Sequence, residues 1–229
     1  MNTAIQSDQP LDKPAQILSS AESPPSAPAP PELEPMTLAQ AWNLLRADMR
    51  RKRAGFASLP HDRTFFRRYI KLNLEFGSIA VMVFRYGQWA TRLRNPVLKL
   101  IFGASYLILR IFSMALTGIS VVPESDIGPG FIIHNFSCIF VWAEHIGENC
   151  TVNQGVTIGN LRGSGGLPKI GNNVYVGSGS KVVGNIKVGN NVVIAANSLV
   201  IMDVPDNATV MGVPARVISR TASSEYLKF

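Results

Sequence analysis

Aliphatic residues recur every six positions along the C-terminal half of the chain. A helix would repeat them every 3.6 residues and an ordinary strand every second residue, whereas six fits short strands that turn a corner once per interval. The pattern predicts a parallel β-helix over residues 119–218, in which each aliphatic side chain stacks on its counterpart in the next coil. The ladder comprises Val121, Ile127, Ile133, Ile139, Ile146, Val152, Ile158, Ile170, Val176, Val182, Val188, Ile194 and Val200.

Residues 160–169 interrupt this ladder. They read Asn-Leu-Arg-Gly-Ser-Gly-Gly-Leu-Pro-Lys, and their glycines, proline and polar side chains are typical of a loop. We expect the loop to project from the β-helix, because loops held by a rigid scaffold often line active sites. The alternative is a surface insertion without a role.

Residues 37–118 are predicted to form a helical domain. Thr37 is placed to cap a helix that ends at Ala54, and further helices are expected over residues 63–76, 79–94 and 97–117. Residues 1–36 hold eight of the 15 prolines and few core-forming side chains, so they are predicted to be a disordered extension. Residues 219–229 are expected to form a short polar tail.

Positive charge is concentrated in the helical domain. Residues 37–118 carry 14 Lys and Arg against three Asp and Glu, whereas the whole chain has a net charge of +7. Such a domain suggests an anionic partner. A solvated helix face and an anionic membrane surface remain open as explanations. Nucleic acid is disfavoured, because no recognition motif accompanies the basic cluster at residues 50–53.

The expected compartment is the cytoplasm. The N-terminus lacks the basic and apolar stretches of a signal peptide, and the longest apolar run, residues 100–109, is shorter than the roughly 20 residues of a membrane span. Cys138 and Cys150 lie inside the repeat and are interpreted as buried, reduced thiols.

Three segments resemble the serine acetyltransferase-type hexapeptide acyltransferases, a branch that includes acetyltransferases of exopolysaccharide (colanic-acid-type) biosynthesis. They are residues 127–130 (IGPG), 153–159 (NQGVTIG) and 204–216 (VPDNATVMGVPAR). The resemblance implies a left-handed β-helix, a homotrimer or dimer of trimers, and acetyl-CoA bound in the groove between neighbouring β-helices, with no metal.

Acetyl transfer from a thioester to a hydroxyl needs a general base, and histidine suits this role near neutral pH. His61 is interpreted as a turn residue and His145 as a structural residue at a seven-residue step of the ladder. His134 lies in the coil where the resembled family keeps its base, and is the predicted base. If the six-residue register of the ladder is kept unbroken, Asn135 occupies the position of the family's base. If this chain lacks one residue just before it, His134 occupies that position.

Other departures from the resembled family concern the acceptor. Ser120 stands where the family has the Asp that orients the catalytic imidazole, and Leu167 replaces a second histidine. A zwitterion needs charged partners once it is desolvated, so the site is interpreted as poorly built for serine. A neutral sugar hydroxyl held near Phe136 and Trp142 fits these losses better.

The resemblance also implies the groups that contact the co-substrate. A phosphate of acetyl-CoA is expected to attract a cationic side chain, because charge-assisted hydrogen bonds are strong. The expected contacts are Gly177, Ser178, Ala195 and Gly212 through their backbones, and Lys181 or Arg216 through their side chains.

The sequence therefore predicts an acetyl-CoA-dependent O-acetyltransferase acting on a sugar or lipid-linked sugar in surface polysaccharide biosynthesis. The basic helical domain would lie at the inner face of the cell membrane. The alternatives are a serine O-acetyltransferase of cysteine biosynthesis and a non-catalytic hexapeptide scaffold. A β-helix carbonic anhydrase is excluded, because it needs three coil histidines for zinc and two are present.

Overall fold

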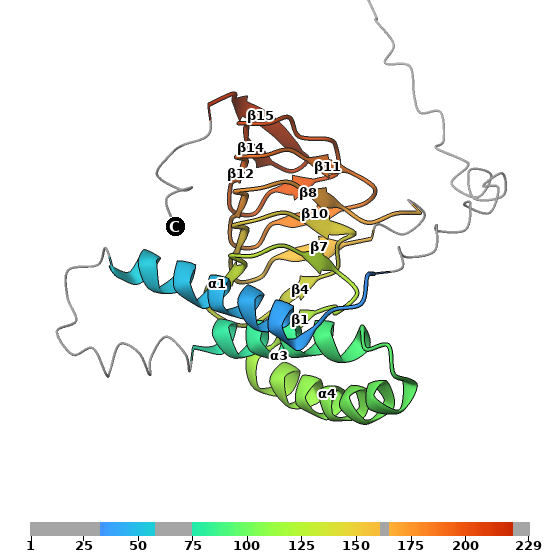
Figure 1. The fold of residues 1–229 in the computed structure, drawn as a ribbon. Coiled ribbons are helices and arrows are strands. Elements are labelled where there is room, and N and C mark those ends of the chain that lie inside the picture. The colour runs from blue at the N-terminus through green and yellow to red at the C-terminus, as the bar shows by residue number, and fades with distance from the viewer. Residues whose placement is uncertain (1–32, 58–74, 161–164, 222–229) are drawn as a thin grey trace, which may run out of the picture.

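The computed structural model describes residues 33–57, 75–160 and 165–221. Within these ranges, helices α1 (Leu38–Ala57), α3 (Phe76–Thr91) and α4 (Pro96–Thr117) lie at one end of a β-solenoid (Figure 1). The helices predicted from residues 37, 79 and 97 are confirmed. Outside the described residues lie residues 63–74 of the helix predicted over residues 63–76, residues 1–32 of the extension predicted over residues 1–36, His61, and residues 222–229 of the predicted tail.

The solenoid consists of three parallel sheets, each of which receives one short strand from successive coils. The strands are β1 (Ile119–Val121), β2 (Asp126–Ile127), β3 (Ile132–Ile133), β4 (Ile139–Val141), β5 (His145–Ile146), β6 (Thr151–Val152), β7 (Thr157–Gly159), β8 (Lys169–Ile170), β9 (Tyr175–Val176), β10 (Lys181–Val183), β11 (Lys187–Val188), β12 (Val193–Ile194), β13 (Leu199–Val200), β14 (Thr209–Gly212) and β15 (Ala215–Ser219). Sheet A has the order β1-β4-β7-β10-β13, sheet B has β11-β8-β5-β2, and sheet C has β15-β14-β12-β9-β6-β3. The predicted parallel β-helix is confirmed.

The six-residue ladder forms the core of this solenoid. Each of its aliphatic residues is buried, and the register pairs them coil by coil, as with Val152 and Val176 or Val176 and Ile194. Among the strands of the described residues, only β15 runs antiparallel, and it pairs with β14 to close the far end of the solenoid. Because every coil buries its apolar side chains against the next, the stack is continuous from β1 to β14.

Local sequence explains where the helices begin and end. The Thr37 hydroxyl accepts a hydrogen bond from the Gln40 backbone N–H, while the Gln40 side chain accepts one from the Thr37 backbone, which is the reciprocal capping box. Asn95 caps α4 through its side chain, and Pro96 occupies the first turn. Gly118 ends α4 in the left-handed conformation, with φ of 64°.

Helix α3 seals the first coil of the solenoid. Ala80, Val81 and Phe84 join the solenoid core, and the Phe84 ring lies 6.3 Å from the Phe131 ring. At Gly77 the helix backbone comes so close that an added Cβ would lie 2.2 Å from the Ile133 carbonyl oxygen. Glycine is therefore required there, and it holds α3 directly against the coil that carries His134.

Candidate active site

One corner of the solenoid, between sheets C and A, gathers the predicted base and several predicted acetyl-CoA contacts. The register pairs Ile133 with Val152, Val152 with Val176, and so on up to Val210. The residues that follow these paired positions stack in a column, which we call the C–A column. It consists of His134 and Asn135, Asn153 and Gln154, Gly177 and Ser178, Ala195 and Ala196, and Met211 and Gly212.

His134 is half-buried at the base of this column, beside α1. Its backbone N–H donates to the Val152 carbonyl at 2.9 Å. Lys52 is buried nearby, where its ammonium contacts the Ile133 carbonyl at 3.2 Å and the Glu75 carboxylate at 3.0 Å. Burial, and secondly the charge of Lys52, lower the pKa of His134 below its ordinary value. The imidazole is thus neutral near pH 7 and able to accept a proton.

The turn that follows His134 has an unusual backbone. Asn135, Ser137 and Cys138 all adopt positive φ angles, of 64°, 80° and 56°, although none of them is glycine. The Asn135 amide donates to the Gln154 side chain at 2.8 Å, which joins the first two levels of the C–A column. Strained turns of this kind cluster at functional sites, because surrounding structure must hold them in place.

Two side chains of this turn differ in their surroundings. Phe136 is 56% exposed, and its ring packs at 5.2 Å against that of Phe76 at the start of α3. Cys138 is exposed, so its predicted burial is wrong, because the positive φ angles turn this residue outward from the coil. Cys150 is buried as predicted, and burial raises its pKa to about 12.

The predicted acetyl-CoA residues are divided between the C–A column and its margins. The backbone N–H groups of Gly177 and Ala195 donate to Ile194 and Val210 of the next coil, at 2.8 and 2.9 Å. These two N–H groups are therefore already used in hydrogen bonds between coils, and a bound molecule would contact the exposed edges of the C–A column instead. Lys181 begins β10 beside it, with its ammonium on the Gly155 carbonyl.

Other predicted contacts lie higher on the solenoid. The Gly212 N–H donates to the Ser198 hydroxyl at 3.3 Å, and the Ser178 carbonyl accepts from Asn197 at 2.8 Å. Arg216 is exposed on β15, paired in register with Met211 of β14. Both cationic candidates, Lys181 and Arg216, therefore border the C–A column, and their role in binding phosphate stays a prediction.

The remaining predicted acceptor residues lie elsewhere. Ser120 is in the middle of β1, in register with Phe140 of sheet A. Trp142 follows β4 and Leu167 precedes β8, so both lie at the next corner, between sheets A and B. Since sheet A separates the two corners, one chain does not bring Trp142 and Leu167 together with His134.

The A–B corner also carries a histidine–carboxylate pair that sequence reasoning missed. His145 Nδ1 lies 2.8 Å from the Asp126 carboxylate, and both side chains are about half exposed. His145, interpreted from the sequence as a structural residue at a seven-residue step, begins β5 and pairs in register with Asp126 of β2. The sequence contained a signal for this pair, because Asp126 directly precedes the ladder residue Ile127 and His145 directly precedes the ladder residue Ile146.

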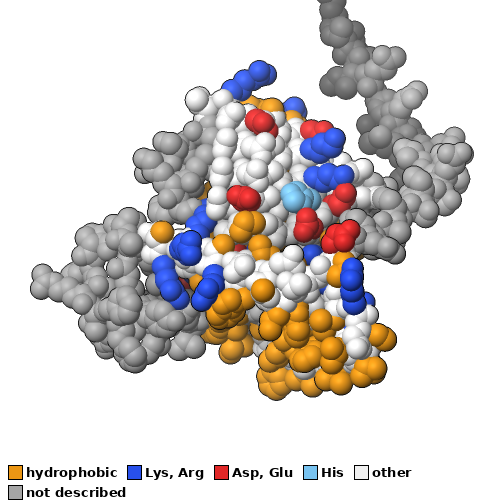
Figure 2. All heavy atoms as spheres, in the orientation of Figure 1, with side chains coloured by type: hydrophobic (Ala, Val, Ile, Leu, Met, Phe, Trp, Pro, Cys, Tyr) orange, Lys and Arg blue, Asp and Glu red, His pale blue; other side chains and the backbone are white. Residues whose placement is uncertain are grey.

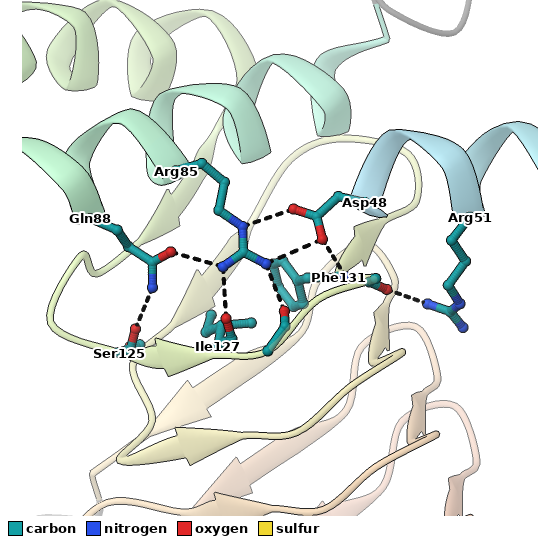
Figure 3. A network of polar contacts seen from close by, with 9 residues as sticks. Asp48, Arg51, Arg85, Gln88, Ser125, Ile127 and Phe131 are labelled. Atoms are coloured by element: carbon teal, nitrogen blue, oxygen red, sulfur yellow. Dashed lines mark hydrogen bonds and ion pairs between the residues drawn. The ribbon is translucent and has the colours of Figure 1, made fainter. Parts of the chain in front are cut away.

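A buried ionic network holds the helices against the coil below His134 (Figure 3). The Arg85 guanidinium contacts the Asp48 carboxylate at 2.8 Å and donates to the Ile127 and Gly128 carbonyls, each at 2.7 Å. Asp48 also accepts from the Phe131 N–H at 2.8 Å. Both ionic side chains are almost fully buried.

Two further contacts extend this network. The Gln88 amide donates to the Ser125 carbonyl at 3.0 Å, and Arg51 donates to the Gly130 carbonyl at 2.7 Å (Figure 3). Residues 125–131, which lead into β3 and His134, are thereby pinned to both α1 and α3.

Within the described residues, no group of three or more His, Cys, Asp or Glu side chains is placed to hold a metal ion.

Comparison with known families and proteins identifies the type of solenoid. Residues 168–201 match the model of the bacterial transferase hexapeptide (six repeats). The chain is 38% identical to a serine acetyltransferase of Synechococcus elongatus over 148 residues, which cover 63% of this chain and 58% of that protein. It is 34% identical to the Bacillus pumilus serine acetyltransferase over 158 residues, covering 66% and 69%. The chain thus spans a little over half the length of the Synechococcus protein.

Solved structures agree with these relatives. The serine acetyltransferase of Brucella abortus in complex with coenzyme A superposes with a TM-score of 0.65 and 28% identity, covering 80% of this chain and 70% of that one. The Neisseria gonorrhoeae enzyme in complex with serine has a TM-score of 0.63 and 26% identity, covering 80% and 70%.

These comparisons correct the predicted acceptor. The relatives and structural neighbours are serine acetyltransferases, so the prediction of a sugar acceptor in polysaccharide biosynthesis is wrong. The uncharged side chains of Ser120 and Leu167 do not exclude serine, because a single chain need not carry every group that contacts the acceptor. The predicted resemblance to hexapeptide-repeat proteins of the serine acetyltransferase type is confirmed, and this chain belongs to the serine acetyltransferase family of hexapeptide-repeat proteins.

Proposed function

We propose that this protein is an acetyl-CoA-dependent serine O-acetyltransferase. The observation that carries the proposal is the C–A column, which places a neutral histidine at its base in a chain that belongs to this family. The Brucella structure in complex with coenzyme A and the Neisseria structure in complex with serine support the two substrates.

His134 is the general base of this reaction. Its imidazole takes the proton of the serine hydroxyl while the hydroxyl oxygen attacks the carbonyl carbon of the thioester. As the tetrahedral intermediate collapses, the carbon–sulfur bond breaks and the imidazolium returns the proton to the leaving thiolate. The rigid turn at Asn135–Cys138 and the contact between Asn135 and Gln154 keep the imidazole in place.

A neighbouring chain completes the site. Trp142, Leu167 and the ion pair between Glu144 and Lys169, whose charged atoms are 2.8 Å apart, lie at the A–B corner, away from His134. A homotrimer with parallel solenoids sets the A–B corner of one chain against the C–A column of the next. It supplies the polar groups that a desolvated serine zwitterion needs and that one chain lacks. Lys181 and Arg216 border the same groove and would bind the phosphates of acetyl-CoA.

The test is serine-dependent release of coenzyme A thiol by the purified full-length protein. Wild type is expected to release thiol with L-serine and acetyl-CoA, and His134→Gln to lose about 10²–10⁴-fold in kcat. His145→Gln is compared directly, and Arg94→Gln, which is exposed just before α4, is the control that should retain turnover. Loss in His145→Gln alone would transfer the role of base to the His145–Asp126 pair, and no release by wild type would refute serine acetyl transfer.

A further inference from the structure

Helix α4 has the reverse of the usual arrangement of polar and apolar faces. A surface helix of a globular protein directs its apolar stripe inward and its polar side outward. In α4 the inward residues include Tyr106, Ser113 and Thr117, which are buried. The outward residues are large and apolar, and Leu100 and Phe112 are 74% and 71% exposed.

The outward apolar face is also unusually wide. At about 100° per residue, its members cover roughly 220° of the helix circumference. A single partner helix packs against a much narrower seam. The exposed large apolar residues of α4 are Val97, Leu98, Leu100, Ile101, Leu107, Ile108, Leu109, Ile111, Phe112, Met114 and Leu116. A fluid, extended surface covers such a face better than another helix does.

Helices α3 and α4 carry basic side chains and no acidic ones, and the nearby carboxylate of Glu124, which acts on the inner residue Tyr106, belongs to the first coil. No Asp or Glu occurs between Phe76 and Thr117, a stretch that contains α3 and α4. Arg94 and Lys99 are exposed at the N-terminal end of α4, and Arg46, Arg50 and Arg53 are exposed on α1. In Figure 2, apolar side chains gather over α4, and Lys and Arg side chains lie along the upper margins of that patch. An apolar face bordered by cations is complementary to anionic lipid.

The inner face of α4 is held firmly against α3. The Tyr86 and Ser105 hydroxyls share a hydrogen bond of 2.6 Å, and the Trp89 and Phe102 rings meet edge to face at 4.9 Å. By length and composition α4 is the one described helix that could cross a membrane. Its packing on α3 and its polar inner stripe fit a helix that lies along a surface with one side on protein.

We propose that α4 lies in the surface of an anionic lipid bilayer, with its apolar face among the acyl chains and the neighbouring basic side chains at the headgroups. Figure 1 places α4 at the end of the solenoid opposite the β14–β15 hairpin, so the solenoid stands above the membrane. The C–A column then faces the aqueous phase, where soluble substrates reach it.

Vesicle flotation of the full-length protein tests this assignment. Wild type is expected to float with vesicles of equal parts phosphatidylcholine and phosphatidylglycerol, and more weakly with phosphatidylcholine alone. Leu100→Ser combined with Phe112→Ser should lower the partition coefficient at least about tenfold. The control is Val213→Ser with Ile218→Ser on the β14–β15 hairpin. These side chains are 72% and 56% exposed, and the control should float like wild type.

Charge and self-association are tested separately. Arg94→Gln with Lys99→Gln is expected to lower binding to anionic vesicles several-fold and to weaken its dependence on salt. Failure of wild type to float would overturn the assignment. So would a halving of the mass in Leu100→Ser/Phe112→Ser by ultracentrifugation without loss of flotation, because α4 would then be covered by a second copy. The serine assay without vesicles is independent of these readouts, so failure of the proposed function is recognised separately.

Discussion

Replacing Arg85 by methionine tests the ionic network that joins the helices to the solenoid. The substitution preserves most of the side-chain bulk but leaves the Asp48 carboxylate buried without its cation. It also removes the donors to the Ile127 and Gly128 carbonyls, each 2.7 Å from the guanidinium. The substitution therefore removes the hydrogen bonds that hold the coil leading into β3 against α3.

The expected cost follows from burial. Removing one partner of a buried ion pair costs about 3–5 kcal/mol, against a total stability of about 5–15 kcal/mol for a typical domain. For a protein of this size the melting temperature should fall by roughly 10 °C. Replacing both partners, with Asp48→Asn added to Arg85→Met, should cost less than the sum of the two single changes, since no unpaired charge remains.

Urea unfolding at fixed protein concentration measures this cost, with tryptophan fluorescence as the probe. Trp42 and Trp89 report on α1 and α3, whereas Trp142 reports on the solenoid. The control is Arg50→Met, because Arg50 is exposed on the same helix as Asp48, and it should change stability by less than about 0.5 kcal/mol. If Arg85→Met were no more destabilised than this control, the network would not hold the helices in place.

Four further predictions concern the C–A column and the cysteines. Because burial and Lys52 lower the pKa of His134, the acid limb of the kcat/KM profile should lie below pH 6.5, and Lys52→Met should move it to higher pH. The unfolded chain binds this proton more tightly, so the contribution of His134 to stability decreases as pH falls below 6.5, which a pH series of urea titrations checks. Gly177→Ala should lower the melting temperature by several degrees, since its Cβ would lie 2.6 Å from a backbone nitrogen of the next coil; an unchanged calorimetric scan would contradict this. A chromogenic disulfide should titrate Cys138 rapidly in the folded protein and Cys150 only after denaturation, and two fast thiols would show that the coil opens.

Most of the fold could be predicted from local pattern. The six-residue ladder identified the solenoid, because each aliphatic side chain needs the same neighbour in every coil. The Thr37 cap predicted the start of α1 closely, since a cap acts within a few residues of itself. The exposure of Cys138 could not be predicted, because a run of positive φ angles at Ser137 and Cys138 has no signal in residue type.

The candidate site was predicted less completely. His134 was singled out from its coil, but its neutral state depends on Lys52, which is 82 positions away in sequence and buried beside it only in the fold. The His145–Asp126 pair follows from the register of β2 and β5, which the ladder implied. The acceptor could not be inferred from one chain. Ser120 and Leu167 are uncharged, but this does not show which polar groups a neighbouring chain supplies to the site.

The sequence by itself determined the solenoid, its core and the basic helical part, because these depend on periodicity and composition. The tertiary structure alone decided which helix faces are covered. Apolar periodicity in α4 fits a buried helix and a surface helix equally well, and only packing shows that its polar stripe faces α3 while Leu100 and Phe112 face outward. Likewise, Asp48 and Arg85 are ordinary charges in sequence, and they form a buried ion pair only because α1 and α3 meet over the first coil.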